Sequence, residues 1–274
     1  ISITDGRAVT VGEAGIASSI SGITFFQGDT GSIYTHDVSG TDSTAQYNTA
    51  YGIAALDAIT TSDNNVAVGY EAGTDITSGD NSVYVGYQAA LNATTGSSNV
   101  FVGAGAAGLG VVTGSTNVGV GNQALYDLTS ATRTVGIGYR ALYNLTTGTG
   151  SIGIGAGAGM GLTTGQNNIC IGDNAGEQFD TETNNIFIGD KAGSGAVAGG
   201  EYNVAIGNYT LDALTSGDNN VAIGHNALTG NTAGSNNVAI GFEALSNPNV
   251  GNTVAIGHQA LKANNNTGYS NTAV

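Results

Sequence analysis

Short runs of alternating aliphatic residues, each closed by a glycine, recur along most of the chain. The run at residues 236–241 reads Asn-Asn-Val-Ala-Ile-Gly, and close variants of it precede and follow. Aliphatic residues stand three residues and one residue before the glycine, with a variable residue between them. This alternation of β-branched residues is typical of a short strand with one buried face. We therefore expect a strand in each copy, with the aliphatic pair buried and the variable residue facing a different environment.

The closing glycines keep an almost constant spacing of 17 residues, with two steps of 18 and one of 16. A unit of 17 residues is too short for a βαβ crossover and for the helical repeats, whose periods begin at about 33 residues. One coil of a parallel β-solenoid fits, and about thirteen coils at about 4.8 Å each make a rod about 60 Å long. The sequence thus predicts an all-β solenoid in which each glycine permits a turn. The glycines are Gly52, Gly69, Gly86, Gly103, Gly121, Gly138, Gly155, Gly172, Gly189, Gly207, Gly224, Gly241 and Gly257.

An asparagine stands four residues before most of these glycines. Stacked in register, such residues would form a ladder of amide hydrogen bonds between coils. The alternative is that each asparagine only forms a turn, but the position is fixed while the neighbouring turn residues vary. The expected ladder comprises Asn65, Asn99, Asn117, Asn168, Asn185, Asn203, Asn220 and Asn237.

The repeat predicts a solenoid over residues 46–274, which we expect to continue beyond the C-terminal end because the sequence stops in mid-motif. Residues 1–45 do not follow the 17-residue register. Strand-like segments at residues 9–12, 22–26 and 32–35 suggest a β-rich cap or joint to a preceding segment.

The run at residues 236–241 and its equivalents resemble the head repeats of YadA-like trimeric autotransporter adhesins. The variant with Ala-Leu and Thr-Thr-Gly, as at residues 139–155, is also similar to repeats of phage and cyanophage tail-fibre proteins. The resemblance covers about residues 48–274 and implies a left-handed parallel β-roll in an intertwined homotrimer. The unit here is longer than the roughly 14-residue repeat of those adhesin heads, so the packing of the trimer is open.

The composition of the chain disfavours some classes of binding partner. The chain has 20 acidic residues against 5 scattered basic ones and a net charge of −15. Binding to nucleic acid or to an anionic lipid surface needs clustered cations, so both are disfavoured. No apolar run approaches the roughly 18 residues of a membrane span. A thin coil buries few side chains of its own, so packing against copies of itself in a three-fold bundle would add stability.

Two other function classes share parts of this pattern. Residues 223–228, Ile-Gly-His-Asn-Ala-Leu, match the hexapeptide of left-handed β-helix acyltransferases, but that hexapeptide should recur every six residues and here it occurs once per coil. Threonine is plentiful, as in ice-binding solenoids, yet it falls in turns where a flat array on strands would be needed.

Candidate metal and thiol chemistry is sparse. His225 and His258 share one repeat position, and three copies on a trimer axis could bind a metal, but surface or interface histidines are the simpler interpretation. Acids such as Asp63, Asp80 and Asp218 lie in turns that calcium or water could occupy. Cys170 occupies the variable strand position and is interpreted as packing.

From these patterns we expect a structural segment of a tail fibre or surface adhesin, extracellular, on a virion or a bacterial cell. We expect no catalytic residues, no cofactor and no metal. The expected partners are copies of the chain and a host-surface glycan or protein receptor. Tyr84, Phe101 and Phe187, at the variable strand position, would contact the receptor or lie within the trimer.

Overall fold

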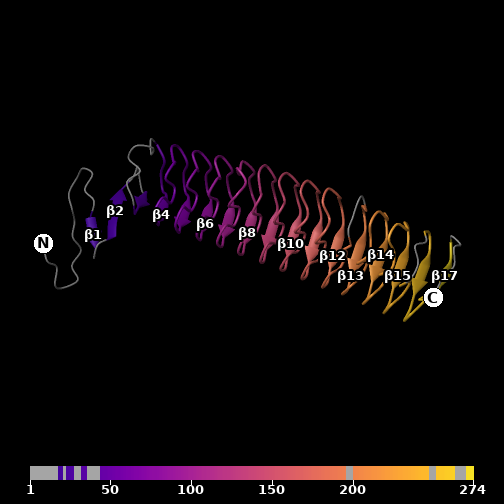
Figure 1. Ribbon diagram of the computed structural model, residues 1–274. Helices are drawn as coiled ribbons and strands as arrows, with labels where there is room; N and C mark the ends of the chain where they lie inside the picture. Colours follow the sequence, from indigo (N-terminus) through magenta and orange to yellow (C-terminus); the bar gives the residue numbers. More distant parts are fainter. Residues whose placement is uncertain are drawn as a thin grey trace.

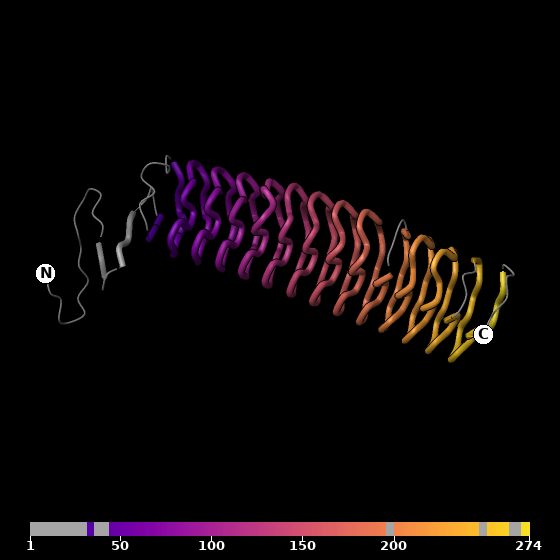
Figure 2. The backbone as a smooth tube through the Cα atoms, viewed as in Figure 1, coloured from indigo at the N-terminus to yellow at the C-terminus, as the bar shows by residue number. Residues whose placement is uncertain are grey.

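The structure is a computed structural model that describes residues 18–20, 23–27, 32–35, 44–195, 200–246, 251–262 and 270–274. In these residues the chain is all-β, and its strands stack side by side along a straight rod (Figures 1 and 2). The strands lie along one side of the rod, and the turns that join them close each coil on the other (Figure 1). The expected parallel β-solenoid of about thirteen coils is confirmed.

Fifteen strands, β3 to β17, pair in parallel in chain order, and β1 and β2 pair antiparallel ahead of them. The strands are β1 Ser18–Ile20, β2 Ile23–Gln27, β3 Ile33–Tyr34, β4 Thr49–Tyr51, β5 Val66–Val68, β6 Val83–Val85, β7 Val100–Val102, β8 Val118–Val120, β9 Val135–Ile137, β10 Ile152–Ile154, β11 Ile169–Ile171, β12 Ile186–Ile188, β13 Val204–Ile206, β14 Val221–Ile223, β15 Val238–Ile240, β16 Val254–Ile256 and β17 Thr272–Ala273.

The N-terminal segment joins the solenoid earlier than the repeat indicates. Ile33 pairs in parallel with Thr49, and Tyr34 with Ala50, so β3 is already one strand of the stack. The step from β3 to β4 is 16 residues, so residues 32–35 join the stack outside the 17-residue register that the sequence shows. The expected strand at residues 22–26 corresponds to β2, and the one at residues 9–12 lies outside the described residues.

The repeat glycines hold the coils at contact distance. Their φ angles lie between 126° and 144°, a region that side chains rarely adopt. A Cβ on Gly86 would lie 2.6 Å from the carbonyl oxygen of Gly103 in the next coil. A side chain at this position would push neighbouring coils apart, which explains why glycine recurs there.

The asparagine ladder is confirmed. Asn220 is fully buried; its backbone N–H donates to Asn203 Oδ1 over 3.0 Å, and its Nδ2 donates to the Gly234 carbonyl over 2.9 Å. The backbone N–H of Asn237 in turn donates to Asn220 Oδ1. Where the chain has serine, as at Ser82, the hydroxyl takes over and accepts the backbone N–H of Asn99. Each coil thus satisfies buried backbone groups of its neighbour, which would otherwise be costly.

The core lies inside the coils, and the middle residues of β4 to β16 contribute to it together with apolar residues of the turns. Ala67, Tyr84 and Phe187 are fully buried there, whereas the flanking valines and isoleucines are partly exposed, as Val66 and Ile154 are. The expectation of a buried aliphatic pair is therefore wrong, and the two strand faces are exchanged. The flanking residues of β5 to β16 are all valine or isoleucine because each stacks on a similar residue of a neighbouring coil, on the outside of the rod. The middle residue varies because its size must match the residues around it in the coil interior.

The interior follows a rule of complementary size. The middle strand residue lies against the fourth residue after the repeat glycine of its own coil and of the preceding coil, and a large side chain at one of these positions faces a small residue at the other. Phe187 lies between Gly176 and Gly193, and a Cβ on either glycine would come within 3.0 Å of its ring. Gly153 instead meets Leu142, whose Cγ would be 2.7 Å from a Cβ on Gly153. Different residues therefore fill the interior in different coils.

Candidate functional site

The outer surface of the strands forms one continuous apolar face, which we call the sheet face. It consists of the first and third residues of the strands β5 to β16, and all of these are valine or isoleucine. Ile137, Ile154, Ile206 and Ile256 remain 37–38% exposed although they stack on their neighbours. Twelve coils about 4.8 Å apart and three residues wide give an area of about 600 Å². An apolar patch of about this size lies at the upper end of those found on single chains, where such patches are often functional.

The aromatic residues expected at a contact surface are not on it. Tyr84, Phe101 and Phe187 have no exposed surface and lie inside the coils. Tyr84 and Phe101 stack with their ring centroids 6.1 Å apart, and burial raises the pKa of Tyr84 to about 12. Both placements expected for these rings, receptor contact and the inside of a trimer, are therefore wrong, because each ring is already enclosed by its own chain.

A group of exposed aromatics instead follows the repeat glycines directly, at what we call the first corner position. Tyr70 and Tyr87 stack there in adjacent coils, with centroids 5.6 Å apart and planes at 14°. Toward the C-terminus the ring of Phe242 lies between those of His225 and His258, at 5.6 Å and 5.3 Å. These two histidines are thus surface residues in an aromatic stack, and among the described residues no three His, Cys, Asp or Glu side chains group as a metal site. His36 lies outside the described residues.

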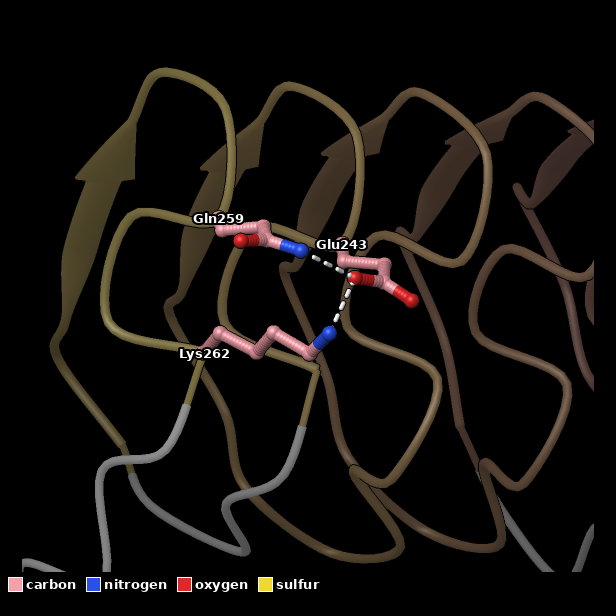
Figure 3. Close-up of polar contacts among 3 residues, drawn as sticks. All are labelled: Glu243, Gln259 and Lys262. Atoms are coloured by element: carbon pink, nitrogen blue, oxygen red, sulfur yellow. Dashed lines mark hydrogen bonds and ion pairs between the residues drawn. The ribbon is translucent and has the colours of Figure 1, made fainter.

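The next residue, the second corner position, carries a ladder of polar side chains. Gln259 Nε2 donates to Glu243 Oε2 over 2.8 Å, and Lys262 Nζ forms an ion pair with the same oxygen (Figure 3). These hydrogen bonds, the one from Lys262 first, hold the pKa of Glu243 below its usual range. Gln88 Nε2 donates in the same way to Glu71 Oε2 over 2.7 Å.

A cationic and aromatic cluster lies in the middle of the rod. The guanidinium of Arg140 is 5.1 Å and 5.2 Å from the ring centroids of Tyr139 and Tyr143, and its Nε donates to Gln123 Oε1 over 2.9 Å. Tyr143 also stacks on Tyr126 with centroids 5.0 Å apart. Because cation–π contacts and a hydrogen bond fix it, Arg140 is held in one orientation.

The polar side chains of the turns, which suggested calcium or ice binding, form hydrogen bonds to neighbouring coils. Asp80 Oδ1 accepts the backbone N–H of Asp63, and Asp218 Oδ1 accepts that of Glu201. The hydroxyl of Thr146 donates to a backbone carbonyl of the next coil over 3.0 Å. These groups satisfy backbone and side-chain hydrogen bonds between coils.

Cys170 is fully buried at a middle strand position, in register with Phe187. Burial raises the pKa of its thiol to about 12, so the reactive thiolate is scarce at neutral pH. The packing role expected for this residue agrees with its place.

No family model matches the sequence, and no match was found among curated proteins or solved structures. None of the described residues forms a helix long and apolar enough to cross a membrane. The fold defines the chain as a parallel β-solenoid, and the sheet face and the two corner positions are its candidate functional surfaces.

Proposed function

We propose that the chain is a structural segment of an extracellular fibre, a tail fibre or a surface adhesin, in which copies of the chain pack through their sheet faces into a homotrimer. The observation that carries the proposal is the sheet face itself. Its strands contain no charged residue in a chain of net charge −15, so the charge lies on the other surfaces. Such segregation leaves one surface suited to burial and the rest suited to water.

The size of the sheet face suits a stable assembly. Three faces of about 600 Å² bury about 1,800 Å² in a trimer, which is the area of a standard specific interface shared among three pairs of chains. The resemblance to YadA-like head repeats and tail-fibre repeats supports three copies and a role in attachment. In this function the solenoid is a stiff shaft or head that carries a binding surface and performs no catalysis.

Analytical ultracentrifugation tests the assembly. The wild-type chain is expected to sediment as a trimer at micromolar concentration. Ile154→Asp places a charge in the sheet face and should yield monomers, because burying an unpaired carboxylate is costly. Thr147→Asp adds the same charge in the exposed turn of the same coil and should leave the trimer intact. A monomeric wild-type chain would refute the homotrimer.

The attachment role has a separate test. Removing residues 46–274 from the whole protein should reduce binding of the particle or cell to its target surface. Unchanged binding would leave a purely structural shaft.

A further inference from the structure

In one coil near the N-terminal end of the rod, the first and the second corner positions both hold very small residues. Tyr87 and Gln88 occupy the two corner positions of one coil, and Asn122 and Gln123 occupy them two coils on. Between them lies Ala104-Gly105, which offers a methyl group and a hydrogen. The backbone does not require this, because Gly105 has a φ of 64° and Gln88 and Gln123 adopt 53° and 55°. A side chain is therefore missing where the fold would accept one.

The gap leaves one aromatic face uncovered. One face of Tyr87 stacks on Tyr70, with the planes at 14°, so the ring lies across the rod axis. Its opposite face is directed at the next coil, where Ala104 has no ring to stack on it, and Tyr87 is 56% exposed. An apolar ring face is thus presented beside the gap.

On each side of the gap, a glutamine amide is bonded through one of its two polar groups to a charged neighbour. The Glu71 carboxylate can only accept, so Gln88 turns its Nε2 toward it and its Oε1 away. Arg140 can only donate, so Gln123 turns its Oε1 toward Arg140 and its Nε2 away. The two glutamine amides are thus oriented by charged neighbours that lie on the far sides of the gap. Two coil spacings, about 10 Å, separate the coils that carry them.

A second coil with very small residues at both corner positions allows a comparison within the same chain. Ala156-Gly157 also lacks large side chains, but Asn174 leans over Gly157, where its Oδ1 would collide with a Cβ. At Gly105 the nearest atom to such a Cβ is Tyr126 Cε2 at 3.4 Å, which is an ordinary contact distance. A Cβ on Gly105 would therefore be in ordinary contact with Tyr126 and Gln123, whereas a Cβ on Gly157 would collide with the neighbouring coil. Asn122 borders the same coil, where its Nδ2 donates to the Ala104 carbonyl over 3.2 Å.

We propose that the surface formed by Tyr87, Gln88, Ala104, Gly105, Asn122 and Gln123 binds a neutral carbohydrate. A pyranose ring offers an apolar face to stack on tyrosine and hydroxyl groups that both donate and accept. The groups that border the gap are uncharged, and a net charge of −15 disfavours acidic sugars. The inference deepens the attachment part of the proposed function, on which its biological meaning rests, because it names the ligand class and the place where that ligand binds.

Saturation-transfer NMR on the intact chain tests the site, with glucose, galactose, mannose and N-acetylglucosamine as neutral probes and glucuronic and sialic acids as charged ones. At least one neutral sugar should receive saturation, and the acids should receive none. Tyr87→Ala removes the stacking face and should weaken binding about tenfold. Gly105→Gln fills the gap with the residue found at the same position on either side, and it should abolish binding while the rod still folds.

Phe242→Ala is the matched control. Phe242 is an exposed ring at the same corner position, but His225 and His258 cover both of its faces, so its loss should not change binding. The proposal is overturned if no neutral sugar receives saturation, if acidic sugars bind as well as neutral ones, or if Gly105→Gln binds like the wild type. Ultracentrifugation measures the oligomeric state independently of sugar binding. A failure of the sugar-binding proposal is therefore distinguishable from a failure of the trimer proposal.

Discussion

Replacing Phe187 with alanine tests whether complementary size holds the interior together. The ring is fully buried, and its centroid is 4.4 Å from that of Phe179. Gly176 and Gly193 on either side have no side chains that could move into the space. The cavity should therefore persist, and Phe187→Ala should cost about 4 kcal/mol, within the range of about 3–5 kcal/mol for such substitutions.

A second substitution should restore part of this loss. Leucine is accepted at the equivalent position of the next coil, where Leu211 has a φ of 52° and faces Ala205. Gly193 has a φ of 61°, so Gly193→Leu in the Phe187→Ala background rebuilds the alanine and leucine pair of that coil. Burying the leucine regains about 2 kcal/mol, and its left-handed backbone costs about 1 kcal/mol.

Gly193→Leu alone should be harmful, because its Cβ would lie 2.5 Å from the Phe187 ring. Overpacking of about 2 kcal/mol and the same backbone cost give about 3 kcal/mol. Independent effects would make the double variant about 7 kcal/mol less stable than the wild type. Complementary packing predicts about 3 kcal/mol instead, so the two positions should be coupled by about 4 kcal/mol.

Cys170 supplies a local assay for this coupling. It pairs in register with Phe187, and its buried thiol should react with a thiol reagent only when these coils open. Labelling rates would give the free energy of that opening for each variant, and urea unfolding followed by circular dichroism would give the global value. A double variant within about 0.5 kcal/mol of the additive sum would refute the reasoning.

Three further outcomes are expected from the same structure. Asn203→Ala should lower the free energy of unfolding in urea by about 2–4 kcal/mol, because it leaves buried backbone groups unpaired. Asn203→Ser should cost less, because serine takes the place of asparagine elsewhere in the ladder. Equal costs for the two variants would count against the ladder. Gly86→Ala should destabilise the rod far more than Gly257→Ala, because a Cβ collides with the next coil at the first site and meets nothing within 4 Å at the second; equal midpoints would contradict this. Burial raises the pKa values of Cys170 and Tyr84 from 9.0 and 10.0 to about 12, so the folded state retains both protons longer. Their contribution to stability should be complete below about pH 9 and be lost as the pH rises toward 12, and a urea midpoint that is constant across this range would argue against it.

The repeat itself could be predicted from the sequence because the coils touch one another through backbone. A residue such as Gly86, which abuts the next coil, has no room for a side chain, and the position that caps a neighbouring coil keeps asparagine or a residue with a hydroxyl group. Positions under these demands recur in every coil. They are therefore visible as a period, and they fix the solenoid.

The direction in which each strand faces could not be predicted in the same way. Alternation shows that the two faces of a strand differ, but it does not show which of them is inside, and β-branched residues suit both. A second signal in the sequence would have decided it. Phe187 occurs with Gly176 and Gly193, and Gly153 occurs with Leu142, so the variable position changes in step with another residue of the coil. Such compensation is expected of residues packed together in an interior and not of surface residues.

The candidate sugar site was also hidden in the sequence, because its residues come from three coils. Tyr87 and Gln123 become neighbours across a gap only when the register of the coils is known, and the orientation of the glutamine amides depends on their charged partners. Neither residue belongs to the positions that every coil shares. The sequence predicts contacts at the variable strand position, but Tyr84, Phe101 and Phe187 are buried there, and the proposed site uses the corner positions instead.

The complementary interior has a further consequence for folding fidelity. The outside of the rod is nearly periodic, so on hydrogen bonds alone a growing stack could pair a coil with the wrong neighbour, one step out. The interior is aperiodic: a ring such as Phe187 fits only between coils that leave room for it, and a misplaced coil would set it against a leucine such as Leu142. The sizes of the interior side chains thus differ from coil to coil and specify which coils can stack on each other. The repeated outer residues cannot specify this order.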